Sequence, residues 1–279
     1  MGEYIFLYII GFIAILFAVI QDLRTREIAN WLTFSLIAFV LAYRAIYSIY
    51  SNNFMFFVYG LFGIFLFVGL GYLFYYARVF AGGDAKLLFG LGGIFPYSSL
   101  FDYAYYGVGF ILLLFTSGVI YTLFYSFFLV RQNYNDFKKS FVNQIKRLKY
   151  FFIVSIILAI LVFFTRDVYD SVIIINIFAV FVLLSPFLFA YVRAVEKSCM
   201  IQLISPDKLT EGDWLERDVY VNGKVIKKNF AGLNFNQILI LRKRGKKVMI
   251  KTGVPFAPAF LIAFFVLLII LRYSSFKLL

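Results

Sequence analysis

Long apolar runs separated by short polar turns make up most of the chain. We expect membrane spans at about residues 4–21, 31–50, 54–77, 103–130, 150–165, 171–192 and 255–271. Most are long enough, at 1.5 Å per helical residue, to cross a hydrocarbon layer about 30 Å thick. An eighth apolar segment, about residues 85–95, precedes Pro96 and is short for a span. The pattern predicts an all-α polytopic membrane protein with about six to eight transmembrane helices.

The pattern changes between residues 193 and 254, where charged residues are frequent and strand-like alternation appears. Asn222-Gly223, between two short β-favouring runs, predicts a hairpin with a type I′ turn. Residues 237–241 and 248–250 suggest a second hairpin. We therefore expect three parts: a helical membrane domain, a small antiparallel β domain and a last transmembrane helix, at residues 1–192, 193–254 and 255–279.

Composition supports a membrane protein and excludes several chemistries. Hydrophobic residues make up 63% of the 279 residues, far above the usual value for soluble domains. The chain has no histidine, which excludes Ser-His-Asp and Cys-His catalysis and imidazole metal sites. Its one cysteine, Cys199, cannot form an internal disulfide or a multi-cysteine zinc site. We expect no metal and no other cofactor.

The net charge of +13 is gathered in a few loops, one of them the expected polar loop 131–149, which carries six basic residues. If the turn after residue 22 is cytoplasmic and residues 85–95 cross the bilayer, 23 of the 27 basic residues fall on the cytoplasmic side. This bias predicts a multi-pass protein of the plasma membrane, with the β domain and any site near residues 22 and 84 facing the cytoplasm. Such clustering indicates topology rather than binding to nucleic acid, and the lipid bilayer is the expected partner.

Two acids, Asp22 and Asp84, are placed differently from the others, most of which fall in loops or tails. Both lie at ends of apolar helices, on the same predicted side. Two such carboxyl groups can share one proton, because like charges close together cannot both ionise cheaply. One then acts as base on a water while the other protonates the scissile carbonyl oxygen, which hydrolyses a peptide without a covalent intermediate or a metal.

Other interpretations of the same residues remain open. Asp84 after Gly82-Gly83 is also in place to cap a helix, and Asp22 beside Arg24 could be a solvated interfacial charge. Acids within a membrane also mark proton paths in transporters. Lys86 fits an interfacial anchor as well as a site residue.

These segments resemble a known family. Ala81-Gly-Gly-Asp84-Ala-Lys86-Leu-Leu resembles the Gly-x-Gly-Asp-x-Lys-Leu form of the motif of membrane aspartyl proteases. Asp22-Leu-Arg-Thr-Arg-Glu-Ile-Ala-Asn30 is similar to the Asp-x₅-Ile-Pro-Asn segment of type IV prepilin peptidases. Residues 209–215 and 253–260 resemble the C-terminal region of archaeal members. The likeness is strongest to archaeal preflagellin and prepilin peptidases and covers about residues 1–96 and 193–272.

The resemblance implies that Asp22 and Asp84 are catalytic, supported by the matching residues Gly82, Gly83, Lys86 and Asn30. It also implies substrates: pilin- or archaellin-like precursors with a basic leader and an apolar helix. Two positions depart from the pattern, because Ala81 stands where the motif has its first Gly and Ala29 where it has Pro.

We therefore expect a membrane aspartyl endopeptidase that removes the leader peptide of preflagellin- or prepilin-like precursors on the cytoplasmic side. The alternative is a non-catalytic membrane protein, either a proton-coupled transporter or a subunit of an assembly platform. A cleavage assay separates the two.

Overall fold

The computed structural model divides into two compact units, residues 1–124 with 254–279 and residues 125–253. The residues it describes are 2–164, 172–221, 224–229, 232–245 and 247–276. Each unit is considered by itself. The division into three parts expected from the sequence stays a prediction.

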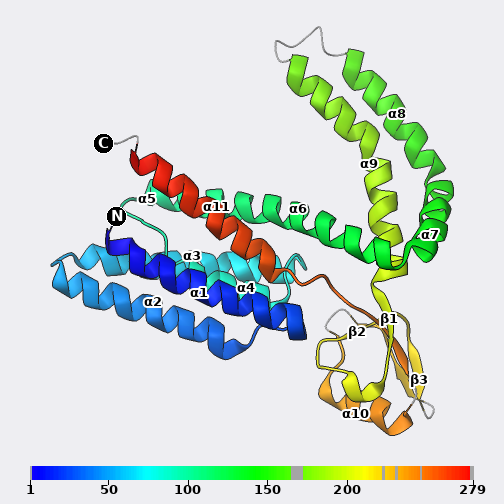
Figure 1. Cartoon of the computed structure of the whole chain (residues 1–279), viewed down its shortest axis with the longest axis horizontal. Coiled ribbons are helices and arrows are strands. Elements are labelled where there is room, and N and C mark those ends of the chain that lie inside the picture. The colour runs from blue at the N-terminus through cyan, green and yellow to red at the C-terminus, as the bar shows by residue number, and fades with distance from the viewer. Residues whose placement is uncertain (1, 165–171, 222–223, 230–231, 246, 277–279) are drawn as a thin grey trace. The chain divides into compact units, whose positions relative to one another are not determined.

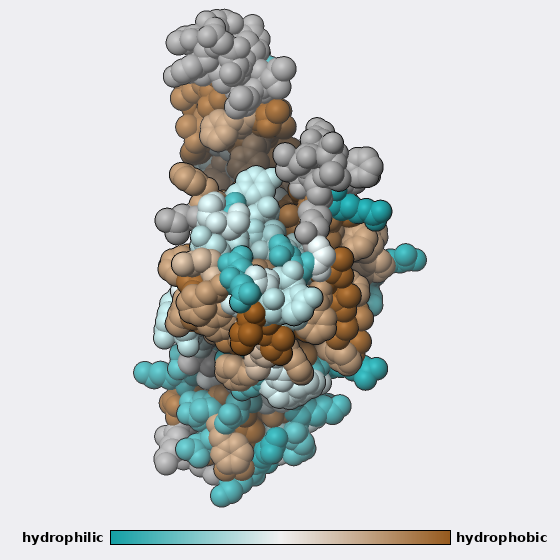
Figure 2. Space-filling model, turned by 90° about the vertical axis from the view of Figure 1, so that its left-hand side faces the viewer, coloured by the Kyte–Doolittle hydropathy of each residue, from teal (hydrophilic) through white to brown (hydrophobic). Residues whose placement is uncertain are grey.

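The first unit is a bundle of apolar helices (Figure 1). Its elements are α1 Gly2–Thr25, α2 Asn30–Tyr50, α3 Phe54–Tyr76, α4 Gly82–Leu91, α5 Leu100–Asp102, the π-helix Tyr103–Val108, α6 Gly109–Gln132, which continues into the second unit, and α11 Ala257–Phe276. Large apolar side chains on the outer helix faces are exposed, among them Ile9, Phe39 and Phe65. Brown apolar side chains are also prominent on the visible face in Figure 2. Such surfaces suit contact with lipid.

Helix α4 is short but is enclosed by its neighbours. It packs against α2 and α3, and close approach is possible because glycines lie at the contacts. A Cβ atom at Gly63 would collide with the carbonyl oxygen of Gly92, and one at Gly92 with that of Gly63. A Cβ atom at Gly90 would come within 2.7 Å of Leu36. The small residues therefore let a ten-residue helix sit in the interior of the bundle.

The expected fold class is confirmed. Within the described residues, five helices are long and apolar enough to cross a membrane, or six if the bent pair α7 and α8 is counted as one span. Residues 257–272 form a further, shorter apolar helix in α11. A count of six spans is the lower end of the expected six to eight. It is no higher because α4, with ten residues, and the apolar part of α11, residues 257–272, are shorter than a full span.

In the second unit, the expected polar loop 131–149 is wrong. Its sequence forms the amphipathic helix α7, Tyr134–Arg147, which is bent by 64° from α8, Lys149–Phe164. Phe137 on α7 lies in a buried cluster with Ala194 and Val195 of α9, Val172–Cys199. This apolar contact favours the helix, since its basic residues stay exposed while Phe137 is covered.

The β domain follows α9. Its elements are β1 Ile201–Ile204, the 3₁₀ turn Pro206–Lys208, β2 Trp214–Leu215, β3 Val219–Val221, β4 Lys224–Ile226, α10 Phe235–Arg244 and β5 Val248–Lys251. One antiparallel sheet has the order β1-β5-β2, and β3 pairs with β4 as an antiparallel hairpin. The first expected hairpin is therefore confirmed in its strands, while its Asn222-Gly223 turn lies outside the described residues.

The second expected hairpin is wrong, because residues 237–241 are helical in α10. Asn234 is the N-cap and forms a capping box with Gln237. Ile238 and Leu241, three positions apart, are both buried in the domain core, and Gly245 ends the helix at φ 67°. Local capping and helical spacing thus outweigh the β propensity of this apolar run.

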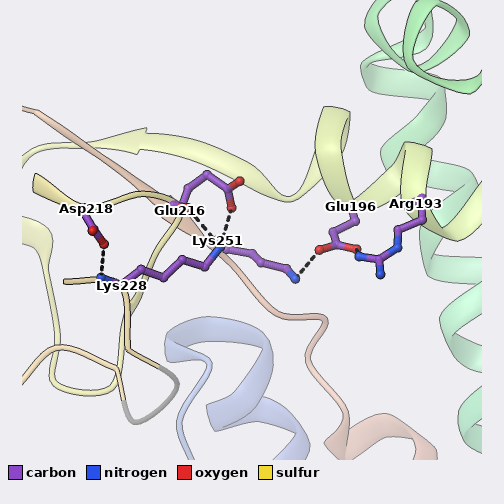
Figure 3. Close-up of polar contacts among 6 residues, drawn as sticks. All are labelled: Arg193, Glu196, Glu216, Asp218, Lys228 and Lys251. Carbon is purple, nitrogen blue, oxygen red and sulfur yellow. Dashed lines mark hydrogen bonds and ion pairs between the residues drawn. The ribbon is translucent and has the colours of Figure 1, made fainter. Parts of the chain in front are cut away.

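Polar contacts tie the end of α9 to the sheet (Figure 3). Glu196 accepts a 2.6 Å hydrogen bond from Lys251 of β5 and a 3.1 Å bond from Arg193 of its own helix. The N–H of Thr252 also donates to the carbonyl of Met200 at 2.8 Å. The end of α9 is therefore joined to the β domain by hydrogen bonds as well as by the chain itself.

Candidate active site

The first predicted acid, Asp22, lies in the last turns of α1 and is 6% exposed. Its Oδ2 accepts a 2.9 Å hydrogen bond from the backbone N–H of Ala257, the first residue of α11. Helix N-termini carry N–H groups without partners in their own helix and the positive end of the helix dipole. The N-terminus of α11 therefore holds the carboxyl group of Asp22.

The second predicted acid, Asp84, lies in the first turn of α4 and is 7% exposed. The N-cap of α4 is Ala81, two residues before Gly83, so Asp84 is not the N-cap residue itself. Its carboxyl group receives a hydrogen bond from the backbone of Ala81. This bond supports the start of α4, and it leaves room on the carboxyl group for a further partner.

The structure brings the two acids together. Asp22 and Asp84 interact electrostatically, although they are 62 positions apart in the chain, and α1 contacts α4. Two buried carboxyl groups within interaction range favour a state that carries one proton between them. This is the protonation state that one general base and one general acid require.

The two motif glycines have different surroundings. A Cβ atom at Gly83 would lie 3.0 Å from the Cβ atom of Ile28 and 3.3 Å from its backbone nitrogen. A Cβ atom at Gly82 would meet the ring of Tyr75 at 3.7 Å, an ordinary contact. A Cβ atom at position 83 would therefore need Ile28 to shift by a few tenths of an ångström, so glycine eases the close approach of the start of α4 to the segment that follows Asp22.

The remaining predicted site residues, Lys86 and Asn30, also meet. The ammonium group of Lys86 on α4 donates a 2.7 Å hydrogen bond to Oδ1 of Asn30 at the start of α2. This contact joins the segment that follows Asp22 to the segment that follows Asp84. Together with Gly83, it fixes the turn after α1 against the first turn of α4.

Sequence reasoning missed Gln21, the neighbour of Asp22. Its Oε1 accepts a 2.9 Å hydrogen bond from the N–H of Ala29. This bond explains one departure from the motif, since a proline at position 29 would have no N–H to donate. The other departure is also accommodated: Ala81 has φ −69°, which any L-residue adopts, so glycine is not required there.

The part of the chain that contains both acids is similar to known proteins. The profile of the "Type IV leader peptidase family" matches residues 9–130. A "Preflagellin peptidase" of Methanocaldococcus jannaschii is 34% identical over 89 residues, which is 32% of this chain and 38% of the relative. Those of Methanococcus maripaludis and Methanococcus voltae are 27% and 31% identical over 134 and 137 residues.

These alignments cover 45% and 46% of this chain, and in both cases 58% of the relative. The chain thus spans between about a third and three fifths of the relatives' lengths. No solved structure matches the chain significantly. The matched residues contain both acids and their motifs, so the resemblance of this chain to the type IV leader peptidase family is confirmed over residues 9–130.

Proposed function

We propose that the protein is a membrane-embedded aspartyl endopeptidase that removes the leader peptide of preflagellin- or prepilin-like precursors on the cytoplasmic side of the membrane. The observation that carries the proposal is the pair of buried, interacting acids, Asp22 and Asp84, within the region matched to the leader peptidase family. The name preflagellin peptidase, given to three relatives, supports this class of substrate.

The pair supplies the groups needed for one hydrolytic cycle. The ionised carboxylate takes a proton from a water molecule, whose oxygen attacks the carbonyl carbon of the scissile peptide. The protonated carboxyl gives its proton to the carbonyl oxygen, which forms a neutral tetrahedral diol. The carboxyl group that took the proton from water then gives it to the amide nitrogen, while the other carboxylate takes a proton from one diol hydroxyl. The C–N bond breaks, a carboxylic acid and an amine are released, and one proton is again shared by the pair.

The positions of the acids suit a junction between a polar leader and an apolar helix. Asp22 is near the C-terminal end of an apolar helix, and Asp84 is near the N-terminal end of another. Both carboxyl groups therefore lie close to a polar turn rather than in the middle of an apolar run. A precursor whose helix enters the bilayer beside this bundle presents the start of that helix at the same level.

Cleavage of a pilin-like precursor in liposomes tests the proposal. Asp22→Asn and Asp84→Asn are each expected to lower the rate by several orders of magnitude, because an amide cannot act as the base or carry the shared proton. Asn retains the size of the side chain, so insertion and yield stay near wild type. Asp136→Asn, which changes an exposed acid on α7, is the matched control and leaves cleavage unchanged.

A near-native rate in either Asn variant would refute the aspartyl mechanism. The transporter or assembly-platform alternative would then replace it. The double variant sharpens the test, since residues that act as one unit have non-additive effects. Loss of both acids is therefore expected to slow cleavage little more than loss of one.

A further inference from the structure

Arg44, in the second half of α2, is an unusual residue for this bundle. It is 0% exposed and lies within an apolar helix of membrane-spanning length. A buried charge is costly unless hydrogen bonds satisfy it. Within the described part of the chain no carboxylate forms an ion pair with Arg44. Hydrogen bonds to other groups must therefore stabilise the buried guanidinium.

Those partners are backbone carbonyl groups. Nε donates to Gly93 at 2.6 Å, Nη2 donates to Phe95 at 2.7 Å, and Nη1 donates to Phe56 of α3 at 2.7 Å. The guanidinium also lies over the ring of Phe56, 4.7 Å from its centre. The side chain of Arg44 thus connects three parts of the bundle: its own helix α2, the start of α3 and the segment just after α4.

Gly93 and Phe95 directly follow α4, which ends at Leu91. The carbonyls of Leu88, Gly90 and Leu91 in the last turn of α4 accept from the N–H groups that follow them, so the guanidinium binds carbonyls just beyond the helix end, where the negative end of the dipole favours a cation. Inside a bilayer water cannot satisfy these groups. The guanidinium, whose donors lie in a rigid fork, therefore fixes the chain at the end of α4 at a defined depth.

The bundle makes room for this contact at Gly60 of α3. A Cβ atom at Gly60 would overlap the side chain of Arg44. Residue 60 thus has to be glycine for the guanidinium to occupy its present position. Arg44 and Gly60 form a matched pair at the end of α4 opposite Asp84.

We propose that Arg44 is a positioning residue of the active site: by holding the end of α4 it sets Asp84 against Asp22. The proposal rests on the proposed function for its effect on cleavage, but not for its effect on geometry. Asp84 and Gly93 are nine positions apart, and α4 runs from Asp84 to within two residues of Gly93, so a short rigid helix and a brief turn join acid and anchor. Axial movement or rotation of α4 at its far end is carried directly to Asp84.

Disulfide cross-linking measures this geometry without requiring catalysis. The reference chain carries Asp22→Cys and Asp84→Cys, with Cys199→Ser so that these are its two thiols. Copper phenanthroline oxidises the pair in liposomes, and loss of labelling by maleimide-polyethylene glycol reports the disulfide. Arg44→Met in the reference chain is expected to slow cross-linking several-fold, and Arg44→Lys to slow it less, because an ammonium reaches fewer of the carbonyls.

Kinetics of precursor cleavage, in chains that retain both acids, give a second readout. Misplacing a reacting group by about 1 Å costs on the order of 100-fold in rate, so Arg44→Met is expected to lower kcat by about that factor while KM is unchanged. Tyr43→Phe is the control. It removes a 2.7 Å hydrogen bond from the neighbouring residue to the carbonyl of Glu3, a bond that does not involve α4, and is expected to leave both readouts unchanged.

Four results overturn the proposal. Arg44→Met could cross-link and cleave as the parent does, or could raise KM with kcat unchanged. The reference chain could fail to cross-link, in which case there is no juxtaposition for Arg44 to set. If Arg44→Met does not accumulate in the membrane, Gly60→Ala is used instead, because it displaces the guanidinium without removing it; it is also expected to slow cross-linking and to lower kcat. The fourth result is that neither variant accumulates, which would identify Arg44 as a folding residue instead.

Discussion

The hydrogen bond from α11 to Asp22 can be removed by one substitution. Ala257 is the first residue of α11, and proline is tolerated at the first position of a helix because the N–H there has no helical partner. Ala257→Pro therefore keeps the helix but deletes the donor of the 2.9 Å bond to Oδ2 of Asp22. Ala257→Val is the matched control, since it adds comparable bulk at this fully buried position and keeps the N–H.

The expected size of the effect follows from the environment of the bond. A hydrogen bond to a charged group is worth about 1.5–3 kcal/mol, which corresponds to roughly a 10- to 150-fold lower rate if it is needed to hold the carboxylate in the transition state. A backbone hydrogen bond from Phe256 to Asp22 remains in the variant. We therefore expect a loss nearer tenfold than 150-fold, and smaller than that of Asp22→Asn.

The assay compares cleavage of one pilin-like precursor by Ala257→Pro, Ala257→Val and the parent chain in liposomes, with detergent-solubilised thermal unfolding as a measure of folding. Ala257→Pro is expected to be about tenfold slower than Ala257→Val at similar unfolding temperatures. Equal rates for the two variants would refute the role given to the N-terminus of α11. A common loss of folding would show that bulk, not the donor, is the cause.

Three further predictions concern other parts of the chain. Ala29→Pro is expected to cleave within about threefold of the parent, because φ −66° already suits proline and one lost hydrogen bond is worth about 1 kcal/mol at most sites. Arg242→Met is expected to destabilise the β domain by about 1 kcal/mol in urea unfolding, since it loses contacts to three carbonyl groups, whereas Lys243→Met on the same helix has little effect. In a Cys199→Ser background, external maleimide is expected to label Asn52→Cys but not Lys138→Cys; the reverse would contradict a cytoplasmic site.

The long helices were predictable because each depends on its own run of residues. The expected spans 31–50 and 54–77 coincide within a residue or two with α2 and α3. The segments that form α7 and α10 carry helical signals that are weaker than their overall polar or β-favouring composition. The helical spacing of Phe137 and Phe141 in α7, and the Asn234 capping box of α10, both indicated helices in segments assigned to a loop and a strand.

The candidate site was predictable in its acids but not in what holds them. Asp22 and Asp84 stand out because acids at the ends of apolar helices are rare. Ala257 could not be identified as a partner of Asp22, because its contribution is a backbone N–H that every residue except proline carries. Nor does the sequence show that Arg44 binds the carbonyls of Gly93 and Phe95, since any carbonyl is a possible acceptor.

The contact between Asp22 and Ala257 joins groups that are 235 positions apart. Both acids therefore leave the ribosome and enter the bilayer long before the backbone group that holds one of them has been made. Until α11 is made and inserted, the nascent bundle contains both acids but not the N–H of Ala257 that binds Asp22. The order of synthesis thus delays assembly of the candidate site to the last helix, so that a chain stalled in the β domain contains the whole segment matched to the leader peptidase family but lacks the backbone group that binds Asp22.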